Sequence, residues 1–301
     1  MRRSSHIAVL MTVLAALLWA TSFSVIKVGL RSIEPYTFLF LRFVIATALL
    51  VPGVLAARKG RLLLKYIAGR YPALLGLALA ASFGFQFRAQ TEIPASTAAI
   101  IINSSTLLVA PLSAALLTER IGIRKVIALV LGMAGVYLIT ARSAGGGAGG
   151  TLLGNLLISA SAVSTAIYIV VTKKALSEKR LEEFPLITAV FIWTLPVYLV
   201  LAAPALRRGV DITGEAWVAI IYLAVFCTAL AFMLWARAIR RIGALTSAIV
   251  LLSELVFGVL IARIFLAEAL PVPTLAGCAL IGLGIFVVGV REQDERASVA
   301  A

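Results

Sequence analysis

LLTERIGIRKVIALVLGMAGVYLI, residues 116–139, returns in altered form 149 residues later as FLAEALPVPTLAGCALIGLGIFVV, residues 265–288. Each stretch contains a glutamate that is followed sixteen residues later by a glycine. Apolar segments resemble one another through composition alone. A charged residue and a glycine that both match at the same shift seldom arise by chance. The two stretches therefore predict that the chain consists of two related halves.

Other positions agree with this duplication. Near the start of each half, a slightly smaller shift of 146 residues sets Lys27 over Lys173. The pairs that match at a shift of 149 residues are Phe83 with Phe232, Arg88 with Arg237, Ile93 with Ile242, Ala95 with Ala244, Thr97 with Thr246, Ala99 with Ala248, Ser104 with Ser253, Glu119 with Glu268 and Gly135 with Gly284.

A glycine-rich stretch, SAGGGAGG, lies between the two halves. Such low-complexity segments are typical of flexible connectors. We therefore expect a first repeat at 1–142, a linker at 143–150, a second repeat at 151–290 and a cytoplasmic tail at 291–301.

The composition places both halves in a membrane. Of the 301 residues, 62% are apolar and only 13% are charged, and the mean hydropathy is +1.07, whereas a soluble domain carries about a quarter charged residues. A helix needs about 20 mostly apolar residues to cross the hydrocarbon core. Segments that meet this requirement lie at 7–29, 35–56, 72–91, 95–118, 121–140, 152–172, 184–205, 215–236, 243–266 and 271–290.

Five helices in each half mean that the second half must cross the membrane in the opposite sense to the first. We therefore predict an all-α integral membrane protein with ten transmembrane helices, arranged as two inverted five-helix repeats around a central cavity. The N-terminal segment could also serve as a secretory signal. However, its apolar stretch continues to Lys27 without a small-residue cleavage site, which favours a retained span.

The net charge of +14 is distributed unevenly about the membrane. With a cytoplasmic N-terminus, 19 of the 27 lysines and arginines fall on the inner side and 7 on the outer side, while Arg42 lies inside a span. This is the positive-inside pattern. The basic residues therefore indicate topology rather than nucleic-acid binding, and both termini are expected in the cytoplasm.

The residues that many catalytic sites need are scarce. His6 is the single histidine, and Asp211 and Asp294 are the only aspartates, both outside the spans. No glycine-rich loop followed by lysine and serine or threonine is present to hold a nucleotide phosphate. We therefore predict no enzyme, no metal site and no cofactor. Cys227 and Cys278 lie within predicted spans and indicate no disulfide.

Polar and aromatic residues concentrate at the centres of six predicted helices, which correspond in pairs: first with sixth, third with eighth, fourth with ninth. Polar groups at this depth are costly unless they face the bundle interior or a wet cavity. Serine and threonine can instead bond to their own helix, and the aromatic residues can simply pack. The candidate substrate-binding residues are Trp19, Phe23, Phe83, Gln86, Asn103, Ser105, Thr106, Ser164, Tyr168, Phe232, Trp235 and Glu254.

Glu254 is the most costly member of this set, because a carboxylate at a helix centre costs about 2.5 to 3.5 kcal/mol on insertion scales. It is expected to carry a proton, to bind cargo, or to serve a structural role beside Arg42 or nearby hydroxyls. Arg42 itself is expected to pair with a carbonyl or an acid rather than to contact substrate. Arg88, near a helix end, can extend toward the interface.

The fifth and tenth helices have small, apolar centres, which allow helices to approach closely. The contact is expected either within one chain or between two chains, so both a monomer and a homodimer are consistent with the sequence. The residues concerned are Ala128, Gly132, Gly135, Gly277, Cys278, Gly282 and Gly284.

This pattern resembles the EamA family of the drug/metabolite transporter superfamily. The resemblance is carried by LLWATSFSVIK at 17–27, PYTFLFLRF at 35–43 and the repeated endings. It implies an exporter of amino acids, other metabolites or drugs in a bacterial or archaeal cytoplasmic membrane, and one branch exports aromatic amino acids. Many members carry Leu-Glu-Pro in the ninth helix; Glu254 matches that glutamate, but Leu255 replaces the proline.

The cavity residues narrow the expected cargo. No lysine lies near the midplane to hold a phosphate dianion, which disfavours sugar-phosphate exchange. Aromatic faces and a carboxylate attract an amino group or another cation. We therefore expect a secondary transporter that exports small amphiphilic metabolites, above all aromatic or other neutral amino acids, by alternating access. The alternative is a multidrug or organic-cation/proton antiporter. The expected partners are a small-molecule substrate and membrane lipid, and not nucleic acid; a coupled proton is a further candidate, which the antiporter alternative requires.

Overall fold

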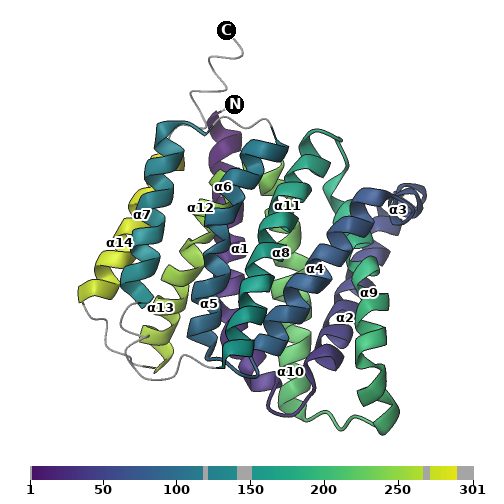
Figure 1. Cartoon of the computed structure of the whole chain (residues 1–301). Helices are drawn as coiled ribbons and strands as arrows, with labels where there is room; N and C mark the ends of the chain where they lie inside the picture. Colours follow the sequence, from purple (N-terminus) through teal and green to yellow (C-terminus); the bar gives the residue numbers. More distant parts are fainter. Residues whose placement is uncertain (1, 118–120, 141–150, 267–271, 290–301) are drawn as a thin grey trace.

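The computed structural model describes residues 2–117, 121–140, 151–266 and 272–289, and every regular element in these ranges is a helix (Figure 1). The first half contains α1 (Arg2–Gly29), α2 (Pro35–Ala56), α3 (Gly60–Ile67), α4 (Arg70–Ala89), α5 (Ala95–Asn103), α6 (Ser105–Leu116) and α7 (Ile123–Thr140). The second half contains α8 (Leu152–Ser177), α9 (Glu183–Arg208), α10 (Gly214–Tyr222), the π-helix η2 (Leu223–Leu230), α11 (Ala231–Ile239), α12 (Ala244–Leu251), α13 (Ser253–Leu266) and α14 (Val272–Gly289).

The length and hydropathy of these helices fit an integral membrane protein. Seven described helices are long and apolar enough to cross a bilayer, or eight if α3 and α4, which meet at a 71° bend, form one span. The all-helical membrane fold is therefore supported. The number of ten spans and the inverted relation of the halves stay predictions. The linker at 143–150 and the tail after 290 lie outside the described residues, as do Glu119 and Glu268.

Helices of the first half pack mainly against helices of the second. α1 contacts α10, η2 and α11; α4 contacts α8; α2 contacts α9; and α6 contacts both α8 and α12. α7 and α14 lie side by side at one edge of the bundle, with α2, α3 and α9 at the other edge (Figure 1). The bundle is therefore assembled from contacts between the halves, and its middle is the meeting point of both.

Close approach of glycines holds α7 against α14. A Cβ atom on Gly135 would lie 2.5 Å from the carbonyl oxygen of Gly277, and one on Gly277 would lie 2.7 Å from the carbonyl oxygen of Gly135. A Cβ atom on Gly284 would come within 2.9 Å of the Ala128 carbonyl oxygen. These small residues thus pack within one chain, which was one of the two arrangements expected for them.

The helix α3 was missed by the sequence analysis, which placed these residues outside the spans. It is short and amphipathic, with Leu63 and Tyr66 buried and Leu64 exposed. The Tyr66 hydroxyl accepts a hydrogen bond from the Glu182 N–H at 3.0 Å, and the Trp193 indole donates to the Ile67 carbonyl at 2.9 Å. Contacts with α9 and with the loop before α9 therefore hold this helix in place. A search for apolar stretches of membrane length cannot detect a helix this short.

Three predicted spans are less regular than expected. The fourth span is interrupted at Ser104, between α5 and α6, and the ninth at Leu252, between α12 and α13. At the second break the Leu252 N–H donates to Ile249 and the Leu255 N–H donates to Leu252, each three residues back instead of four. The eighth span contains the eight-residue π-helix η2. These irregular turns all lie in the interior of the bundle.

Candidate functional site

A cavity of about 110 Å³ lies where the two halves meet. Its walls come from α1, α2, α4, α5, α6 and α8 and from α11, α12 and α13, and a space of this size admits several waters or a small solute. Eleven of the twelve residues predicted from the sequence line it: Trp19, Phe23, Phe83, Gln86, Asn103, Ser105, Thr106, Tyr168, Phe232, Trp235 and Glu254.

Ser164 is the twelfth predicted residue, and it does not line the cavity. Its hydroxyl donates to the Ala160 carbonyl at 3.0 Å, within its own helix. The next residue, Thr165, lines the cavity instead and shares a hydrogen bond of 2.7 Å with Ser82 on α4. The two neighbours face different directions because one step along a helix turns a side chain by about 100°, and a role of Ser164 in substrate binding stays a prediction.

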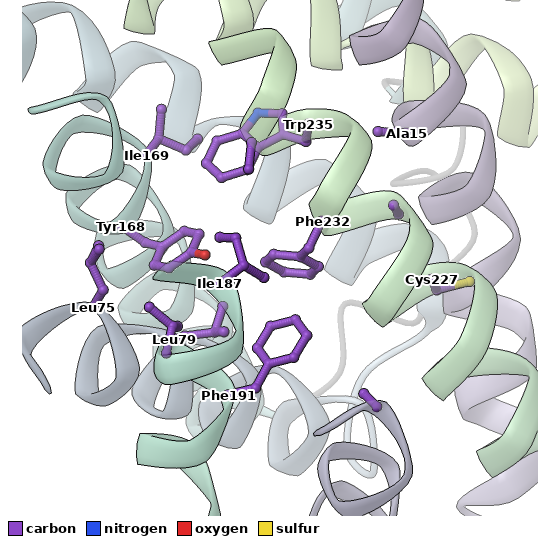
Figure 2. Close-up of a cluster of buried hydrophobic side chains, with 14 of the residues drawn as sticks. Ala15, Leu75, Leu79, Tyr168, Ile169, Ile187, Phe191, Cys227, Phe232 and Trp235 are labelled. Carbon is purple, nitrogen blue, oxygen red and sulfur yellow. The ribbon is translucent and has the colours of Figure 1, made fainter. Parts of the chain in front are cut away.

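Aromatic rings form one wall of the cavity, with Phe232 at their centre. The ring centroid of Phe232 lies 5.2 Å from Trp19, 6.0 Å from Tyr168 and 6.4 Å from Trp235. Tyr168 stacks on Trp235 at 5.7 Å, and Phe83 reaches Phe232 at 6.1 Å. Figure 2 shows Tyr168, Phe232 and Trp235 turned toward one another. Rings packed in this way keep fixed positions and give the cavity an apolar, π-rich face.

The π-helix η2 helps to fix this wall. In an α-helix the Ala231 N–H would donate to Cys227, four residues earlier, but here it donates to the carbonyls of Phe226 and Thr228. The Cys227 carbonyl instead accepts the indole N–H of Trp19 at 2.8 Å. A second indole of the wall, that of Trp235, donates to the Ser247 hydroxyl at 2.9 Å. Segments of π-helix are frequent at functional sites. Through the Trp19 bond, this one is connected to α1.

Arg42 lines the cavity, although the sequence analysis did not select it for substrate contact. The residue is only 1% exposed, and its Nε donates to the Thr228 hydroxyl at 2.6 Å. The guanidinium lies 4.7 Å from the ring centroid of Phe83 and 5.7 Å from that of Phe87. Its partners are thus a hydroxyl and two aromatic faces, instead of the expected carbonyl or acid. The Nη1 atom has no hydrogen-bond partner among the described residues.

Glu254 lines the same cavity from the first turn of α13. The break at Leu252 makes this position a helix N-terminus, where backbone N–H groups and the helix dipole favour an anion. Among the lysines and arginines whose side chains the structure describes, none has a nitrogen within 4.0 Å of its carboxylate. Arg42 and Glu254 thus form no ion pair, and of the structural alternative for Glu254 only satisfaction by nearby hydroxyls is left beside a role in proton or cargo binding.

The remaining polar residues join the halves across the cavity. Thr106 on α6 donates to the Ala248 carbonyl on α12 at 3.4 Å, and Ser161 on α8 donates to the Ser82 carbonyl on α4 at 2.7 Å. Asn103 differs, because its Nδ2 donates to the Ala99 carbonyl at 2.8 Å within its own helix.

Ser22 also lines the cavity and was not predicted; only its position one turn from Trp19 pointed to it.

Comparison with known proteins identifies the family of this chain. The family model described as "EamA-like transporter family" matches residues 6–141 and 152–290, nearly the whole chain on either side of the glycine-rich stretch. The chain belongs to the EamA-like transporter family. It is therefore a membrane transporter and not an enzyme, and membership of this family implies a small-molecule substrate.

Relatives align with this EamA-family chain along most of its length. An "Uncharacterized transporter" of Archaeoglobus fulgidus is 27% identical over 91% of this chain and 95% of its own length. A "Probable amino-acid metabolite efflux pump" of Salmonella typhimurium is 25% identical over 92% and 93%, respectively. A "Probable terminal-alkyne amino-acid exporter" of Streptantibioticus cattleyicolor is 25% identical over 96% and 95%.

The fold is also found in a solved structure, titled "Crystal structure of protein". It superposes with a TM-score of 0.77 and covers 94% of this chain and 97% of its own, at 22% sequence identity. The two proteins therefore share a fold.

Proposed function

We propose that this transporter exports small amphiphilic metabolites, above all aromatic or other neutral amino acids, by alternating access of the central cavity. The observation that carries the proposal is one cavity, built by both halves, that combines an aromatic wall with a carboxylate, Glu254. Relatives named as amino-acid efflux pumps and exporters support the substrate class.

The helix contacts support the inverted repeat on which alternating access depends. If the halves are exchanged, α1 corresponds to α8 and α4 corresponds to the eighth span, η2 with α11. The contact of α1 with η2 and α11 then maps onto the contact of α8 with α4. Likewise, the contact of α1 with α12 and α13 maps onto that of α8 with α5 and α6. A pseudo-twofold axis in the membrane plane accounts for both correspondences.

The orientation that we propose follows the basic residues. Arg237, Arg240 and Arg241 surround one end of the bundle, where Arg240 contacts Glu183 at 2.7 Å. A cytoplasmic position for this end, and for both termini, agrees with the positive-inside pattern, and the bacterial and archaeal relatives support a cytoplasmic membrane. One chain lines the whole cavity, so we propose that a monomer suffices for transport, with or without pairing into a homodimer.

A second candidate function is that of an organic-cation/proton antiporter. The aromatic wall around Phe232 and an acid without an ion-pair partner favour it, because both attract cations. In that case Glu254 would exchange its proton for the cargo. Proton coupling is part of this candidate, whereas an amino-acid exporter does not require it.

Counterflow in proteoliposomes tests the proposal. Purified wild type and Glu254→Gln are reconstituted, and uptake of labelled neutral amino acids is compared with that of labelled aromatic cations at several pH values. We expect the wild type to exchange amino acids and the variant to lose most of this activity or its pH dependence. Size-exclusion profiles establish that the variant is folded. Unchanged transport and pH dependence in a folded variant would contradict the role of Glu254.

A further inference from the structure

A basic and an acidic side chain line the cavity without forming an ion pair with each other. Arg42 extends from α2 in the first half, and Glu254 extends from α13 in the second half. Neither is within 4.0 Å of an oppositely charged group of the described chain. Burying a charge without a partner is expensive, and a ligand that carries both an ammonium group and a carboxylate would supply a partner to each of these two side chains at once.

The surroundings of Arg42 leave its guanidinium available to a ligand. Thr228 takes the Nε–H, and the faces of Phe83 and Phe87 lie against the planar group, but these contacts do not include a carboxylate. Thr228 is itself held by the π-helix, because its hydroxyl donates to the Leu223 carbonyl at 2.8 Å. The forked donors of an arginine match the two oxygens of a carboxylate, a geometry that lysine does not provide.

The surroundings of Glu254 complement those of Arg42. The helix break at Leu252 fixes this carboxylate at the start of α13, and the wall around Phe232 and Trp235 lies in the same cavity. A carboxylate beside aromatic faces binds an ammonium group through charge and cation–π attraction. The apolar wall then remains for a side chain.

We infer that the cavity recognises a zwitterion, with Arg42 binding its carboxylate and Glu254 its ammonium group. This inference rests on the proposed transport function and assigns Arg42 as a residue that determines specificity. Because the two charges belong to different halves, a zwitterion joins the halves in one step, whereas an amine or a carboxylic acid compensates only one of them. The site therefore selects amino acids over amines and over simple carboxylic acids.

The test compares three ligands that share a phenylethyl group and differ in their charged groups. L-phenylalanine carries both charges, phenethylamine lacks the carboxylate, and 3-phenylpropanoate lacks the ammonium group. Each is tested on the reconstituted wild type as a competitor of labelled L-phenylalanine counterflow, and on the purified protein by thermal shift. We expect L-phenylalanine to bind at least about tenfold more tightly than either of the others, the effect of one charged contact.

Variants then separate the two charges. Arg42→Gln is expected to weaken L-phenylalanine at least about tenfold and to leave phenethylamine within about twofold, with Arg42→Lys between wild type and Arg42→Gln. Glu254→Gln is expected to weaken L-phenylalanine and phenethylamine and to leave 3-phenylpropanoate unaffected. Arg88→Gln is the matched control, because Arg88 pairs with Glu92 outside the cavity and its loss should not alter ligand preference.

The outcomes distinguish this inference from the proposed function. Equal weakening of all three ligands by Arg42→Gln would show a structural arginine and overturn the inference. Wild type that transports phenethylamine but not L-phenylalanine would overturn it while transport itself stands. If wild type neither transports nor binds L-phenylalanine or phenethylamine, the proposed function is overturned as well. The wild-type ligand series decides the matter even if Arg42→Gln fails to fold.

Discussion

The indole of Trp19 donates its N–H to the carbonyl oxygen of Cys227 at 2.8 Å, across the contact between α1 and the π-helix η2. The carbonyl is available because the Ala231 N–H donates to Phe226 and Thr228 instead. A side chain of the first half is thereby bonded to the backbone of the second half, at the edge of the cavity. The irregular turn of one helix thus sets the position of an aromatic residue on another.

Replacement of this indole tests the connection. Trp19→Phe keeps a ring near Phe232, which lies 5.2 Å away, but it removes the donor for the Cys227 carbonyl. We expect a loss of about 1 kcal/mol in the free energy of unfolding, together with weaker substrate binding. Unfolding titrations and the KM for counterflow measure the two effects. Trp217→Phe, at a residue that is 40% exposed on α10, should change neither.

Much of the fold could be predicted from hydropathy, because bilayer thickness sets the length of an apolar helix. The predicted span at 35–56 coincides with α2, and that at 271–290 includes the whole of α14. The breaks at Ser104 and Leu252 and the π-helix could not be predicted in this way. The π-helix is accompanied by a hydrogen bond from the distant Trp19 to the Cys227 carbonyl, which a local pattern does not contain.

The cavity could be predicted from the cost of burying polar groups, which explains why the polar centres of the helices meet there. The differences from the structure have two physical causes. Ser164 was selected in place of Thr165, because an apolar helix gives no clear phase for its polar face. Arg42 was expected to be neutralised by a protein group, because the sequence does not show that aromatic faces and the Thr228 hydroxyl surround it.

The packing of α7 on α14 should tolerate no side chain at Gly135. A Cβ atom there would lie 2.5 Å from the Gly277 carbonyl oxygen, so Gly135→Leu forces the backbones apart. We expect a loss of about 1–3 kcal/mol in stability, or a failure to fold. Gly282→Leu is the matched control, since nothing lies within 4 Å of its Cβ position. Thermal unfolding of both variants in detergent measures the difference; equal effects would contradict this packing.

Glu92 should contribute a pH-dependent part of the stability. It accepts hydrogen bonds from Thr151, at the start of α8, and from Arg88, whose Nη2 lies 2.6 Å away. The Thr151 bond, with the charge of Arg88, lowers the pKa of this carboxyl below its ordinary value. The folded state therefore gains stability above the ordinary carboxyl pKa, and this gain is lost as pH falls through the lowered pKa.

Glu92→Gln removes that titration. We expect wild type to be slightly more stable than the variant at neutral pH and the difference to vanish in acid; it should be small because the group is exposed to solvent. Unfolding midpoints of both proteins, measured from neutral pH to about pH 3, follow the difference through the carboxyl range. A difference that grows in acid would show that the sign is wrong.

Lys27 and Lys173, which match at a shift of 146 residues, make corresponding hydrogen bonds. Lys27 donates to the carbonyl of Gln90, which caps the C-terminus of α4, and Lys173 donates at 2.9 Å to that of Ile239, the last residue of α11. Gln90 and Ile239 are themselves 149 residues apart. Each ammonium group thus satisfies a terminal carbonyl and the negative end of the helix dipole.

The duplication therefore predicts that the two lysines contribute similarly to stability. Lys27→Met and Lys173→Met should each lower the free energy of unfolding by about 1–2 kcal/mol, and the double variant by their sum, because the sites are far apart in the chain and share no partner. Lys65→Met, at an exposed residue of α3, should have no effect. Unfolding titrations of wild type and the four variants measure these values. A large cost at one lysine and none at the other would contradict the equivalence of the two sites and weaken the case for an inverted repeat.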